Sequence, residues 1–153
     1  MKKFQFSLSK VLDYKDQVLE KEKNHLANLH AKKARIDQCI DDFQVEFEAV
    51  NQRFTKETAQ GISVIQIKTF EFQLQSIRLQ IKQLQSEQKA LSQTIEKQIQ
   101  VVIEASQEVT GLDKLEEKQR MEYNIEQAKG NEAQIAEFVS SRLIRQRIAE
   151  TSF

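Results

Sequence analysis

Hydrophobic side chains recur along the first part of the chain in alternating steps of four and three residues. In this series, counted from Leu8 to Phe54, eleven of fourteen positions are apolar. A seven-residue repeat with two apolar positions is typical of a coiled-coil seam and predicts one long helix over about residues 8–58. Lys15, Glu22 and Lys33 are the three positions that interrupt the seam.

The segment after this series carries the signals that end one helix and begin another. Gly61 is the only glycine among the first 110 residues, and glycine takes the left-handed conformation that commonly ends a helix. Ser63 stands where the next helix needs an N-cap. We therefore expect a turn at about residues 59–63.

The same spacing resumes after the turn and continues from Ile67 to Tyr123, where thirteen of seventeen positions are apolar or tyrosine. It predicts a second helix over about residues 64–148, with Gly111 and Gly130 as weak points because glycine costs about 1 kcal/mol relative to alanine inside a helix.

Two apolar seams joined by a short turn bury their surfaces by folding back on each other. The expected fold class is therefore all-α, a long two-helix antiparallel coiled-coil hairpin that forms a single domain over residues 1–153. Pairing outward from the turn places Phe54 near Ile67 and leaves the second helix overhanging after about Leu112. A parallel dimer of one continuous helix remains the alternative.

Composition supports a helical protein and argues against several classes of partner. The chain has no proline and three glycines among 153 residues, and 30% of its residues are charged. Its 23 basic and 23 acidic side chains cancel, so overall charge favours neither nucleic acid nor an anionic membrane. The single Cys39 fits a reducing compartment, and no stretch approaches the roughly 20 apolar residues of a membrane span. We expect a cytoplasmic protein.

The sequence offers no constellation typical of an enzyme. His25 and His30 are five residues apart and do not share a helix face as an i, i+4 metal-binding pair does. There is no glycine-rich phosphate loop, and two helices form no concave substrate pocket. We therefore expect no catalytic residue, cofactor or metal, and a function carried out by helix surfaces.

Two groups of residues are candidates for such surfaces. An outward row of apolar residues at seven-residue spacing lies near the turn on the second helix, and the first helix has one apolar residue at the equivalent position; a spaced apolar row suggests a partner site. These residues are Ile65, Phe72 and Leu79, with Val45 on the first helix. Both ends of the chain are locally basic through Lys3, Lys10, Arg142, Arg145 and Arg147.

Three blocks of the sequence resemble a known family. The first, over residues 4–14, consists of Phe4, Phe6, Leu8, Lys10, Val11, Leu12 and Tyr14. The others are the charged run KLEEKQRMEY at residues 114–123 and the stretch EAQIAE at residues 132–137. With the length and the expected hairpin, these blocks resemble the flagellar export protein FliJ family over nearly the whole chain.

This resemblance implies a role in the flagellar type III export apparatus. It implies a stalk-like coiled coil that connects a hexameric export ATPase with the membrane export gate and assists export chaperones, as a monomer held at the inner face of the membrane through its partners only. On this interpretation the basic residues meet the ATPase, and Val45, Ile65, Phe72 and Leu79 meet the gate.

Two other interpretations remain open at this point. One is the counterpart of this stalk in an injectisome, a virulence-related type III secretion system. The other is a generic coiled-coil tether or scaffold, which belongs to a different functional class.

Overall fold

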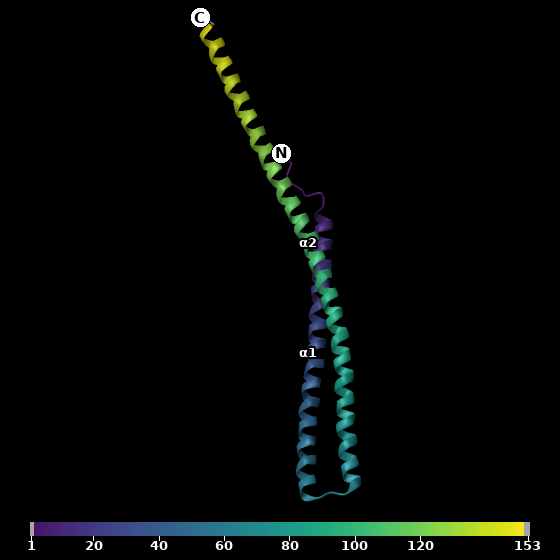
Figure 1. Cartoon of the computed structure of the whole chain (residues 1–153). Helices are drawn as coiled ribbons and strands as arrows, with labels where there is room; N and C mark the ends of the chain where they lie inside the picture. The colour runs from purple at the N-terminus through teal and green to yellow at the C-terminus, as the bar shows by residue number, and fades with distance from the viewer. Residues whose placement is uncertain (1, 152–153) are drawn as a thin grey trace. The chain divides into compact units, whose positions relative to one another are not determined.

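The computed structural model describes residues 2–151, which form two helices, α1 (Ser9–Gln60) and α2 (Val64–Thr151) (Figure 1). Within these residues there is no strand. The chain divides into two units. We call Val18–Ala105 the hairpin unit, and Met1–Gln17 with Ser106–Phe153 the terminal unit.

In the hairpin unit α1 and α2 run antiparallel, side by side, from the turn (Figure 1). Every position of the two predicted heptad series, which we call the inner seam, is buried or half-buried. The best covered apolar side chains include Ile40, Val50, Ile77 and Ile95. The all-α helical hairpin predicted from the periodicity is therefore confirmed.

The register of the hairpin differs slightly from the count made from the turn. The rings of Phe54 and Phe70 pack together with centroids 5.3 Å apart, so Phe54 reaches one seam position beyond Ile67. Phe54 and Phe70 each lie six residues from the turn end of their helix, which explains why they meet. Arg78 stacks over the Phe47 ring, 5.1 Å from its centroid, and adds a cation–π contact to the same end.

The turn has the chemistry expected of it. Gly61 has a φ of 88°, a left-handed conformation that strains any residue with a Cβ. Ser63 and Gln66 then form a capping box, because the Gln66 N–H donates to Ser63 Oγ (3.3 Å) and the Ser63 N–H donates to Gln66 Oε1 (3.0 Å). These bonds satisfy two amide groups that the start of α2 would otherwise leave unpaired.

Two polar pairs replace apolar contacts within the hairpin unit. Gln98, only 8% exposed, donates from Nε2 to the Glu22 carbonyl oxygen at 3.1 Å and to the Glu22 carboxylate at 2.6 Å. The Gln88 amide donates to the Asp37 carboxylate in the same way. A polar pair inside a seam costs stability but resists slippage, because a shifted register leaves the buried amide without its acceptor.

The terminal unit includes a non-helical segment, residues 2–8, which we call the N-terminal strap. Its Phe6 is buried, and Phe4 contacts both the Tyr123 ring (centroids 5.6 Å apart) and the Arg120 guanidinium, which lies 4.9 Å from the Phe4 centroid. The Tyr123 hydroxyl donates to the Lys2 carbonyl. The strap thus covers α2 as far as Tyr123, well beyond Leu112, where pairing with the first helix was expected to stop.

A further cross-helix contact of the terminal unit joins Lys15 to Glu108, whose charged atoms are 2.7 Å apart. The hydrogen bond from this carboxylate, helped by its negative charge, raises the pKa of Lys15 above its ordinary value. The seam lysine is therefore accommodated by an acidic residue on the facing helix.

α2 continues without interruption through Gly111 and Gly130, so neither weak point breaks the helix. From Ala128 to Thr151 every residue is exposed. We call this part of α2 the overhang, and its exposed large apolar side chains include Ile135, Phe138, Val139 and Leu143.

Replacing Gly61 with alanine should destabilise the protein by about 1 kcal/mol, because alanine must adopt a left-handed backbone at that position. Gly111→Ala is the matched control. Its added Cβ meets nothing within 4 Å in a helical backbone, so it should stabilise the protein by about 0.5–1 kcal/mol. Urea unfolding followed by circular dichroism measures both. Equal effects of the two substitutions would contradict the assigned turn.

The polar pair of Glu22 and Gln98 generates a second prediction. Gln98→Leu alone should cost about 1 kcal/mol, because the half-buried carboxylate loses its donor. The double variant Glu22→Leu/Gln98→Leu should recover that loss, since two apolar side chains then fill the seam. A thermodynamic cycle by urea unfolding gives the coupling between the two sites. Additive effects would show that the pair does not act as a unit.

Candidate protein-binding surfaces

The apolar row predicted near the turn exists as an exposed surface. Ile65, Phe72 and Leu79 are 78%, 73% and 66% exposed, while the inner seam of the same helix segment is covered. Large apolar side chains at these values are uncommon as an aligned set on a solvated face. The row is therefore an exposed apolar surface that another protein could cover.

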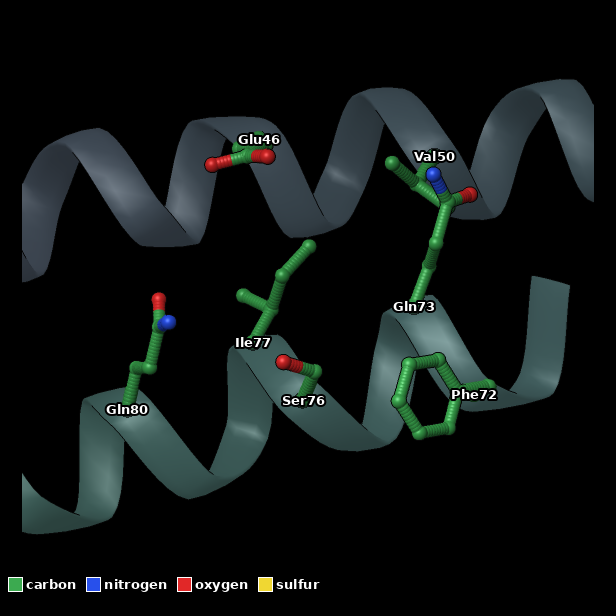
Figure 2. Close-up of a pocket in the computed structure, with 7 residues that line it drawn as sticks. All are labelled: Glu46, Val50, Phe72, Gln73, Ser76, Ile77 and Gln80. Carbon is green, nitrogen blue, oxygen red and sulfur yellow. The ribbon is translucent and has the colours of Figure 1, made fainter. Parts of the chain in front are cut away.

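Shallow hollows lie on both sides of Phe72. One is lined by Glu46 and Val50 of α1 and by Phe72, Gln73, Ser76, Ile77 and Gln80 of α2 (Figure 2). Figure 2 shows Ile77 and Gln73 directed toward α1, whereas Phe72 lies over α2. A second hollow separates Phe72 from Leu79 and includes Gln75 and Ser76. Apolar projections beside polar-rimmed hollows suit a protein partner better than a small ligand.

Val45 does not extend this row. It is 71% exposed on α1, but it occupies the outward position of its own heptad, as the row does on α2. Outward positions of two paired helices point in opposite directions. Val45 is therefore a separate candidate contact on the other face of the hairpin unit.

The basic residues of the terminal unit fall into two groups. Lys3, Lys10, Arg142, Arg145 and Arg147 are all exposed. Because Phe4 contacts Tyr123, Lys3 lies near that part of α2, and Arg142 lies 19 residues, or about 28 Å at 1.5 Å per residue, farther along the helix. The structure does not bring the lysines and the arginines into one patch.

The side chains considered for chemistry are isolated. His25, His30 and Cys39 are exposed. Among residues 2–151 no three side chains of histidine, cysteine, aspartate or glutamate gather as a metal site would require. Over the same range no helix combines the length and the apolar character needed to cross a bilayer.

Sequence reasoning missed the Phe4–Arg120–Tyr123 cluster. Its signals were present, because Phe4 and Phe6 are two aromatic residues placed before the first heptad and Tyr123 is the last position of the second series. Periodicity describes contacts between helices, however, and the strap is not helical.

The sequence of the chain matches a known protein family. The family model described as flagellar FliJ protein matches residues 4–147, which is nearly the whole chain. No curated protein and no solved structure matches the chain.

Proposed function

The chain belongs to the flagellar FliJ family, a family of flagellar export proteins, and we propose that it is the stalk-like connector between the hexameric export ATPase and the membrane export gate. In this proposal it is a monomer without catalytic activity, located in the cytoplasm and held at the inner face of the membrane through its partners. It also assists in handling export chaperones.

The observation that carries this proposal is that two chemically different exposed surfaces occur in different units of one chain. The hairpin unit has the apolar row of Ile65, Phe72 and Leu79. The terminal unit has the exposed basic residues. A connector needs two surfaces that do not compete for the same partner, and dissimilar chemistry provides that separation.

The apolar row is the proposed contact with the gate. Three large side chains that are 66–78% exposed can each contribute about 1.5–3 kcal/mol when a partner covers them. The hollows beside Phe72 would receive projecting side chains of that partner. Val45 is a second proposed gate contact, on the opposite face.

The basic residues are the proposed contact with the ATPase. Exposed arginines at the end of α2 suit an acidic surface, because guanidinium groups form paired hydrogen bonds with carboxylates. Lys3 and Lys10 form a separate contact, since they lie far from the arginines along α2. Such contacts weaken as salt screens them.

Changing Phe72 and Leu79 to aspartate should abolish binding to the cytoplasmic part of the export gate while the helix content stays unchanged, because both side chains are exposed. A pull-down with the purified gate fragment measures the binding. Ile103→Asp, on the same helix of the same unit and also exposed, is the control and should bind normally. The Val45→Asp variant shows whether the outward face of α1 contributes to gate binding. Undiminished binding by the double variant would refute the gate assignment.

Charge reversal of Arg142, Arg145 and Arg147 to glutamate should remove most of the chain's stimulation of the export ATPase. The control reverses three exposed lysines of the hairpin unit, Lys82, Lys89 and Lys97, and so makes the same change in net charge. Phosphate release measured over a range of salt concentrations tests the electrostatic origin. If both triple variants stimulate equally well, the arginines are not the ATPase contact.

A further inference from the structure

A second heptad series runs along α2 on the side opposite the inner seam. Steps of four and three residues connect nine positions of the terminal unit, which we call the back seam. They are Lys114, Lys118, Met121, Ile125, Ala128, Glu132, Ile135, Val139 and Arg142. Met121 and Ile125 each lie two residues from Tyr123, or about 200° around the helix from the last position of the inner seam.

The back seam is uncovered within the terminal unit. Met121, Ile125, Ile135 and Val139 are 59%, 52%, 64% and 48% exposed. A shallow hollow lies at its start, among Lys114, Glu117, Lys118, Met121, Glu122 and Ile125. The inner seam, in contrast, continues with only one apolar position, because the same count past Tyr123 reaches Glu126, Gly130, Ala133 and Glu137.

We propose that the back seam binds an amphipathic helix of another protein, one with acidic side chains toward both ends and a basic side chain between them. The 3.5-residue spacing is that of helix-on-helix packing. Lys114 and Lys118 stand toward one end of the seam and Arg142 at the other, with Glu132 between them. Charged residues at seam positions select partners, since a like charge opposite them is left unpaired on burial.

The same charges disfavour a second copy of this chain. In a parallel pair, Lys118, Glu132 and Arg142 would each face the identical residue of the other copy, and so a like charge. Antiparallel pairing with the best apolar overlap, Met121 against Val139 and Ile125 against Ile135, would set Lys118 against Arg142. Both arrangements place like charges together.

A membrane surface is also a poor occupant. A helix that lies in a lipid interface keeps charged groups on its polar face, whereas Glu132 lies between the apolar residues Ala128 and Ile135 of the back seam. The inference goes beyond the proposed function and does not rest on it, because it concerns one face of α2 and not which apparatus the chain serves.

The test uses the full chain and two synthetic helical peptides of about 30 residues, four heptads in length. The complementary peptide has leucine at its seam positions, glutamate opposite Lys118 and Arg142, and lysine opposite Glu132. The inverted peptide exchanges these charges. Fluorescence anisotropy should show that the complementary peptide binds at least about tenfold more tightly.

Two chain variants assign the binding to the back seam. Val139→Asp should remove it, whereas Ile144→Asp, which changes an exposed apolar residue outside the seam, should leave it intact. The Glu132→Lys variant should bind a peptide with glutamate opposite residue 132 more tightly than it binds the complementary peptide, which has lysine there. Equal binding of the two original peptides, or equal effects of the two aspartate variants, would overturn the proposal.

Two further outcomes would also overturn it. Sedimentation that shows a dimer lost in Val139→Asp would assign the face to a second copy of the chain. Binding to anionic phospholipid vesicles that is lost in Val139→Asp would assign it to a lipid surface. Failure of the ATPase or gate experiments leaves the peptide result unaffected, so the two proposals are tested separately.

Discussion

The inner seam shared by α1 and α2 is the interaction on which the other features depend. Two helices can cover each other along one stripe only, so even Val50 and Ile77, among the best buried side chains, keep 5% and 6% of their surface accessible. Because residues 2–151 form no third layer, the outer face of each helix remains solvated. The seam therefore stabilises the hairpin and at the same time leaves long helix surfaces available to other proteins.

The seam also has to define its register, and apolar side chains alone do this weakly because a shift by one heptad replaces one aliphatic contact with another. Polar pairs supply the missing specificity. Gln98 donates to Glu22 and Gln88 donates to Asp37 in the hairpin unit, and Lys15 pairs with Glu108 in the terminal unit. A slipped register would separate these partners and leave polar groups half-buried and unpaired.

Much of the hairpin could be predicted from spacing, because a seven-residue repeat is a local property of the sequence. The inner-seam positions, the left-handed Gly61 and the cap at Ser63 are of this kind. The contact of Phe54 with Phe70 depends on where each helix ends, which spacing does not specify. The strap was missed because Phe4 packs on Tyr123 without any periodicity. The distance between Lys3 and Arg142 could not be predicted from spacing either, because it depends on where the strap packs on α2.

Hydrogen exchange followed by mass spectrometry tests most directly the central claim, that the inner seam protects the paired helices and leaves the overhang uncovered. Backbone amides exchange slowly where tertiary packing holds a helix, and a helical segment without such packing opens readily. In the isolated monomer, residues 30–60 and 64–95 should exchange much more slowly than residues 128–144. Protection of residues 128–144 equal to that of residues 64–95 would contradict the account, because something within the chain itself would then cover the overhang.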